Sequence, residues 1–156
     1  PISEFKLVLG KYFAGIILCL IALAPTLIYL ISIYTLGQPK GNLDWGATIG
    51  SYIGLIFLCG VYVSIGVFAS SLTDSQIVSF ILSLFLCFFF FIGFEQIAAL
   101  LSHSGMGLSI QKLGINYHYN AISRGVIDTR DVLYFISVIL LFVFASYVSI
   151  KSTKWH

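Results

Sequence analysis

The chain has 156 residues, of which 59% are hydrophobic and 9% are charged, and its formal net charge is +2. Soluble domains carry about 25% charged residues, so a water-soluble fold fits this composition poorly. The eight Lys and Arg residues are dispersed without a basic stripe, which argues against nucleic acid as a partner. The three cysteines lie in separate apolar runs without metal-ligand spacing, so disulfide and zinc frameworks lack support.

Four apolar runs are long enough to cross a membrane, which takes about 20 residues in a helix. None of the four contains Lys or Arg. The sequence therefore predicts an all-α membrane protein with four transmembrane helices and a re-entrant or interfacial helical hairpin before the last one. The predicted spans are residues 12–36, 47–69, 77–101 and 132–150.

The first span contains Pro25, which removes a backbone hydrogen bond and predicts a kink. Neighbouring helices can absorb such a fault in a membrane. Turn-forming residues from Gly37 to Asn42 end this span. The chain opens on Pro1 rather than Met, and its first apolar run is too long for a signal peptide, so we expect a fragment with upstream sequence missing.

The second span begins with Gly46, Gly50 and Gly54, which recur every fourth residue and so share one helical face. Small residues at such spacing let another helix approach closely. The pattern predicts close packing, although a surface that slides during transport needs the same glycines.

The second connection, from Ser70 to Gln76, is so short that it places the second and third spans in an antiparallel hairpin. Thr73 and Gln76 have capping-box spacing, which predicts that Thr73 caps the third helix. Asp74 adds a negative charge at the positive end of that helix.

Glu95 is the one ionisable residue well inside an apolar run, and a charge at bilayer depth is expensive. It is therefore a candidate intramembrane polar site for a proton relay or substrate contact. An interfacial or packing role is favoured over these, because Glu95 lies about two turns from the end of its helix and is followed by Gln96. His103 is too distant along the helix to pair with it.

The third connection, residues 102–131, is long, moderately apolar and interrupted by glycines. We expect short helices that lie at the membrane interface or dip partly into it. The run Tyr117-His118-Tyr119 suits the headgroup level, where amphipathic rings concentrate. Asp128 or Asp131 is expected to cap the last helix.

The last helix ends in an interfacial anchor, Lys151, Lys154 and Trp155. Four crossings place both termini on one side of the membrane. Four basic residues then flank each side, so charge alone leaves the orientation open. These are Lys6, Lys11, Lys151 and Lys154 against Lys40, Lys112, Arg124 and Arg130.

The sequence contains no phosphate-binding loop, no nucleotide fingerprint and no Ser/His/Asp triad. We therefore expect no catalytic, cofactor-binding or metal-binding residue in this chain. If ATP drives its function, another chain must hydrolyse it.

Three stretches together resemble the permease subunit of an ABC-2 type exporter, most closely the gliding-motility-associated branch. They are residues 1–12, which end in Gly-Lys-Tyr, residues 66–78 around the tight turn, and residues 124–135 at the start of the last helix. Their order and spacing cover essentially the whole chain.

The resemblance implies that the four helices correspond to the last four of a six-helix permease domain. It implies a bacterial inner-membrane protein with both ends of this chain in the cytoplasm, and it makes residues 102–131 an outer re-entrant hairpin. Residues 1–11 become a coupling segment that contacts the ATPase through Ser3, Glu4, Phe5 and Lys6. ATP and Mg would be bound by that partner, and a second permease subunit would complete a homodimer or heterodimer.

Two other functions remain open from the residues alone. The chain can be a membrane scaffold or assembly subunit that does not transport. Alternatively, it can be a membrane-embedded enzyme acting through Glu95, His103 or Asp128, although no second group is evidently placed beside any of them.

Overall fold

A computed structural model describes residues 3–37, 44–103, 105–125 and 127–154, with side chains placed up to residue 152. All regular elements within these ranges are helices. Several predictions lie outside the described residues: those on Pro1, on the turn residues 38–42 with Lys40, and on the anchor formed by Trp155 and the Lys154 side chain.

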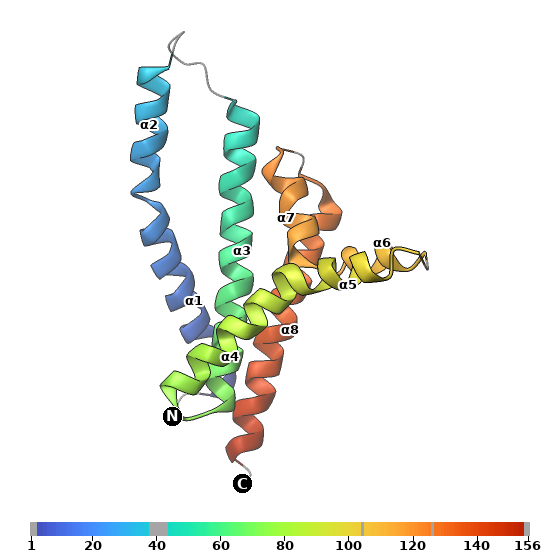
Figure 1. The fold of residues 1–156 in the computed structure, drawn as a ribbon. Helices are drawn as coiled ribbons and strands as arrows, with labels where there is room; N and C mark the ends of the chain where they lie inside the picture. The colour runs from blue at the N-terminus through green and yellow to red at the C-terminus, as the bar shows by residue number, and fades with distance from the viewer. Residues whose placement is uncertain (1–2, 38–43, 104, 126, 155–156) are drawn as a thin grey trace.

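The helices follow one another with short connections (Figure 1). Four of them, together with one π-helical segment, form the first part of the chain: α1 (Glu4–Leu23), α2 (Thr26–Leu36), α3 (Trp45–Leu72), α4 (Gln76–Phe88) and η1 (Phe89–Gly93). The second part comprises α5 (Phe94–Leu100), α6 (Gly107–Gln111), α7 (Ile115–Ser123) and α8 (Thr129–Lys154).

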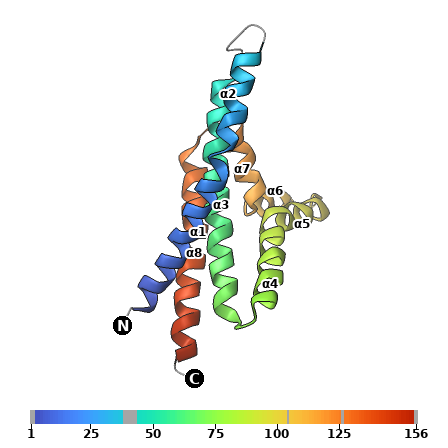
Figure 2. The same ribbon diagram turned by 90° about the vertical axis from the view of Figure 1, so that its left-hand side faces the viewer.

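Four helical stretches of the described chain are long and apolar enough to cross a membrane. They are Glu4–Leu36, Trp45–Leu72, Gln76–Leu100 and Thr129–Ser152. The predicted all-α fold with four membrane-spanning helices is thus confirmed. Because the number of spans is even, α1 begins and α8 ends at the same end of the bundle (Figures 1 and 2).

Pro25 divides the first span into α1 and α2, as the sequence predicts. Proline has no backbone N–H to continue the helix. The hydroxyl of Thr26 donates to the carbonyl of Leu23 at 2.5 Å and lies 2.9 Å from the hydroxyl of Tyr52 on α3. Side chains therefore satisfy the interrupted backbone and attach the break to α3.

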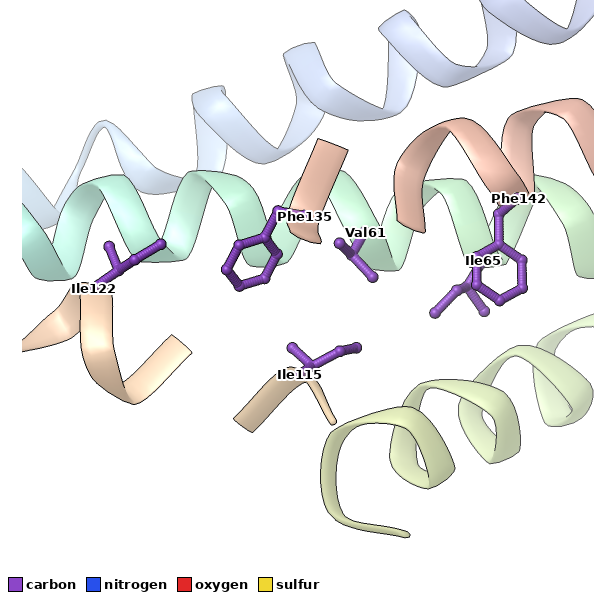
Figure 3. Packing of buried hydrophobic residues seen from close by; sticks show 6 residues of the cluster. All are labelled: Val61, Ile65, Ile115, Ile122, Phe135 and Phe142. Atoms are coloured by element: carbon purple, nitrogen blue, oxygen red, sulfur yellow. The ribbon is translucent and has the colours of Figure 1, made fainter. Parts of the chain in front are cut away.

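The centre of the bundle is α3 packed along α8, and we call these two helices the central pair. Its core contains Val61 and Ile65 from α3 and Phe135 and Phe142 from α8 (Figure 3). Helix α7 adds Ile115 and Ile122 to the same cluster. Lipid tails are as apolar as these side chains, so the stabilisation comes from van der Waals contact rather than release of water.

A second cluster joins α1 to the central pair near the end that holds both termini. Val8 and Tyr12 of α1 are buried against Val143 of α8. The N-terminal helix therefore has a fixed contact with α8 within its first three turns.

The other two spans lie at the side of the central pair, and no residue of their most apolar segments is buried. On α4, for example, Ile77, Phe80 and Phe85 are exposed. In Figure 2, α4 stands apart from α1 on the opposite side of α3. Such faces match the apolar surroundings of a membrane.

The third span changes winding at η1, where the chain runs from α4 into α5. A Cβ on Gly93 would lie 2.8 Å from a ring atom of Phe89, so the glycine makes room for that ring. Helices α5 and α6 project sideways from the bundle before the chain returns to α7 (Figure 1). The short helices expected in residues 102–131 are α6 and α7, whereas the π-helical turn was not predicted.

Candidate functional site

The glycine face of α3 receives α7 of the same chain. A Cβ on Gly50 would lie 2.5 Å from the carbonyl oxygen of Ile122 and 2.8 Å from the backbone of Gly125. A Cβ on Gly54 would lie 3.1 Å from the ring of Tyr119. The absence of side chains at these two glycines lets the backbone of α7 and the turn after it approach α3.

Gly46 contributes through its backbone rather than through an empty Cβ position. A Cβ there would meet only a carboxylate oxygen of Asp44 at 3.6 Å. Its carbonyl oxygen instead leaves no room for a side chain on Gly125, because a Cβ there would lie 3.0 Å from this oxygen. Gly125 has φ +91°, a conformation that other residues rarely adopt, so both contact and geometry require glycine there.

The tight turn between α3 and α4 is capped by a different residue from the one predicted. The hydroxyl of Ser75 accepts from the backbone N–H of Val78, while Thr73 accepts from the N–H of Ser75. The cap predicted at Thr73 is therefore wrong, because the helix begins one residue after Ser75, at Gln76. Asp74 lies exposed in the turn.

Replacing Ser75 with Ala is expected to destabilise the protein by about 1 kcal/mol, because a backbone N–H at the start of α4 loses its acceptor. The matched variant Thr73→Ala is expected to cost less, because its bond lies within the turn. Unfolding by SDS in mixed micelles, followed by circular dichroism, measures both. A larger loss for Thr73→Ala would contradict this assignment of the cap.

A buried histidine connects α7 to the start of α8. Nδ1 of His118 lies 2.5 Å from a carboxylate oxygen of Asp131, and Nε2 lies 2.7 Å from the carbonyl oxygen of Lys112. The imidazole also stacks on the ring of Tyr134, with centroids 3.9 Å apart. A ring that donates from both nitrogens satisfies both acceptors, and the contact with Asp131 is then a charge-assisted hydrogen bond.

Tyr134 reinforces the same connection, because its hydroxyl donates to the carbonyl of Leu113 at 2.5 Å. His118 and Asp131 are 9% and 6% exposed. We call His118, Asp131 and Tyr134 the histidine clamp. It holds the Lys112–Leu113 backbone and α7 against the first turns of α8.

The sequence analysis missed this role of His118 and Asp131. It assigned His118 to the headgroup level with its aromatic neighbours, and it treated Asp131 as an alternative cap. Asp128 is the residue at the start of α8, where its carboxylate accepts from the N–H of Arg130 at 3.0 Å. The usable signal was the spacing of His118 from Ile115 and Ile122, which places all three on one helical face.

A polar cavity of about 460 Å³ opens between α5, α7 and the start of α8. Its charged lining consists of three basic residues, three carboxylates and the clamp histidine. These are Lys112, Arg124, Arg130, Glu95, Asp128, Asp131 and His118. The amides of Gln111, Asn116 and Asn120 complete the polar wall. The helices that line it most, α5, α7 and the start of α8, lie in the half of the molecule away from the two termini (Figure 1).

Glu95 is joined to α7 at the edge of this cavity. Its carboxylate accepts from the amide of Asn116 at 2.6 Å, and Asn116 in turn accepts from Asn120 at 3.2 Å. His103 is exposed in the turn after α5 and lines neither this cavity nor its neighbour. The structure thus brings Glu95 and Asp128 to one cavity and leaves His103 apart.

The described part of the chain has no group of three or more His, Cys, Asp or Glu side chains that could hold a metal ion. The cavity residues are instead suited to hydrogen bonding and to ionic contact. The cavity is therefore suited to bind a polar or charged group.

At the opposite end, the predicted coupling residues surround the start of α1. The hydroxyl of Ser3 accepts from the N–H of Lys6 at 3.4 Å and so caps the helix. The ring of Phe5 meets Tyr147 of α8 edge to face, with centroids 5.9 Å apart. Lys6 is exposed, whereas Glu4 is half-buried. Ser3 and Phe5 therefore hold α1 in place, and Lys6 faces outward.

Comparison with known proteins agrees with this architecture. No curated protein and no solved structure gives a match to the chain. One family model, described as ABC-2 family transporter protein, matches residues 1–154. Members of this family are membrane transport components that do not themselves catalyse a reaction. With four membrane-spanning helices and a match over nearly its whole length, this multi-pass membrane chain belongs to the ABC-2 family of transporter proteins.

Proposed function

We propose that this chain is the permease subunit of an ATP-driven ABC-2 type exporter and moves its substrate by alternating between conformations. A separate ATPase subunit binds ATP and Mg, and a second permease subunit completes the pathway. The family match over residues 1–154 is the observation that carries this proposal.

The start of α1 is the proposed contact with the ATPase. Lys6 is exposed there, at the end of the bundle where α8 also finishes. Helix α1 then runs without interruption from Glu4 to Leu23 and contacts both members of the central pair. A displacement applied at Lys6 therefore acts directly on the core of the bundle.

Such a displacement would shift a population between inward-facing and outward-facing states, as binding energy does in other switching proteins. The proposal places the chain in a bacterial inner membrane, with this end of the bundle in the cytoplasm and residues 102–131 as an outer re-entrant segment. A link to gliding motility or cell-surface assembly follows from the resemblance of its three sequence stretches to that branch.

A scaffold that does not transport is the second candidate from the sequence. Its support was the glycine face of α3 together with the outer hairpin, residues 102–131, as surfaces that bind other membrane subunits. The structure fills that face at Gly50 and Gly54 with α7 of the same chain. One of the two features behind the scaffold is therefore used within the chain itself, and the family match favours transport.

The test is affinity purification from native membranes of the full-length reading frame, tagged after His156, followed by mass spectrometry. An ATPase is expected in stoichiometric amount. Lys6→Glu is expected to lower its recovery about tenfold, because the reversal places a repulsive charge at the contact. Lys151→Glu, the same change at the same end but on α8, is the matched control and is expected to retain the ATPase.

Protease protection must show that both variants insert as the unmodified protein does. If no ATPase is recovered with the unmodified protein under conditions that preserve other membrane complexes, the exporter proposal fails. Equal loss in the two variants would refute the specific contact at Lys6.

A further inference from the structure

We propose that the cavity between α5, α7 and α8 binds the phosphate of an anionic amphiphile, with the apolar part of that molecule in a second cavity beside it. This inference goes beyond the proposed transport function and does not require an ATPase. It rests on charge distribution, cavity shape and position in the fold.

The carboxylates around the cavity are already engaged within the chain. Asp131 contacts the buried ring of His118 at 2.5 Å, and Asp128 accepts from the first turn of α8. Glu95 accepts from the amide of Asn116. Each acidic group therefore has a partner that stabilises its position or its charge.

The basic side chains have no such partners. Lys112, Arg124 and Arg130 are exposed, and none is within ion-pair distance of a carboxylate among the residues that the structure describes. All three basic residues line the same cavity. Arginine binds phosphate, as it binds carboxylate, through paired N–H donors.

The backbone under these residues is fixed. The carbonyl of Lys112 accepts from His118, and Arg130 donates its N–H to Asp128. The clamp thus anchors the backbone of Lys112, and the Asp128 cap anchors that of Arg130. A site held in this way loses less conformational entropy when a ligand binds.

The second cavity, of about 450 Å³, has a different lining. Ala98, Ala99, Gly107 and Leu108 are among its residues, and it shares Glu95 and Gln111 with the first cavity. The two cavities are therefore adjacent, one rich in charge and one lined largely by small and apolar residues. That combination fits a molecule with an anionic head and an apolar tail.

The position in the fold supports the same ligand. The polar cavity lies at the beginning of α8, which is a candidate membrane span, and so near the level expected for lipid headgroups. Leu108, which lines the second cavity, is 58% exposed. Basic pockets between membrane helices are known to take anionic lipid headgroups.

The test uses the purified chain in neutral detergent, titrated with dioleoyl phosphatidic acid and with dioleoylglycerol, and read by native mass spectrometry. Phosphatidic acid is expected to bind and dioleoylglycerol to bind much more weakly. Arg124→Gln and Arg130→Gln are each expected to weaken the binding of phosphatidic acid about two- to fivefold. Lys151→Gln removes one positive charge at the other end of the molecule and is expected to leave the binding of phosphatidic acid unchanged.

Two further arms identify which part of the ligand is bound. Ala99→Phe fills the second cavity and is expected to weaken the binding of phosphatidic acid. In this background, Arg124→Gln and Arg130→Gln are still expected to weaken binding further. Inorganic phosphate is expected to compete only weakly. If inorganic phosphate competes at the same concentration as the lipid, the proposal of an amphiphilic ligand is overturned, and the cavity is a site for free phosphate.

Equal binding of the two lipids would overturn the proposal, as would a loss of binding in Lys151→Gln equal to that in the arginine variants. Thermal unfolding in detergent shows that each variant remains folded. Because no ATPase is present, these outcomes are independent of the transport proposal.

Discussion

Gly50→Ala is expected to lower the free energy of unfolding by about 2 to 3 kcal/mol, although alanine is the better helix former. The new methyl group would lie 2.5 Å from the carbonyl oxygen of Ile122, and this obstacle is backbone that cannot rotate away. Relief requires α7 to move off α3. Titration with SDS in mixed micelles, followed by circular dichroism, measures the loss.

Gly66→Ala is the matched control, because it makes the same change within the same helix. Its Cβ would meet only the hydroxyl of Ser83 at 3.6 Å, which is ordinary contact. This variant is expected to be as stable as the unmodified protein or slightly more stable. If the two variants unfold alike, the backbone of α7 does not pack closely on Gly50.

Asp131→Ala and His118→Ala are each expected to destabilise the protein by about 3 to 5 kcal/mol. Each change leaves a buried polar partner without its hydrogen bond, in a site where His118 is 9% exposed. The double variant is expected to cost clearly less than the sum of the two, because neither group is then left unpaired. The same SDS titration completes this double-mutant cycle.

Asp128→Ala provides the control for removing a carboxylate near the start of α8. Asp128 is exposed and acts as a cap, so its loss is expected to cost about 1 kcal/mol. Strict additivity of the His118 and Asp131 variants would show that the two side chains do not interact. A loss at Asp128 equal to that at Asp131 would remove the distinction between cap and clamp.

The spans and the break at Pro25 could be predicted from sequence because each depends on local chemistry. A run of apolar residues without charge needs lipid whatever its neighbours, and proline lacks its N–H in every context. The glycine spacing on α3 likewise predicts a face for close packing. It does not identify the partner, which is α7 from about 70 residues further along the chain.

The remaining features depend on choices between similar residues or on tertiary contact. Thr73 and Ser75 are both hydroxyl residues near the start of α4, and the backbone of the turn decides between them. His118 reads as an interfacial residue until Asp131 and the carbonyl of Lys112 are brought to its two nitrogens. The cavity is assembled from four helices, so no single segment of sequence carries its pattern.

The central pair has a mechanical consequence. Helix α3 has 28 residues and α8 has 26, so each extends about 40 Å without a break. Both helices contact α1 near one end and α7 near the other. Helix α1 is therefore joined to the start of α8, which forms one wall of the cavity, through continuous helix and without an intervening loop.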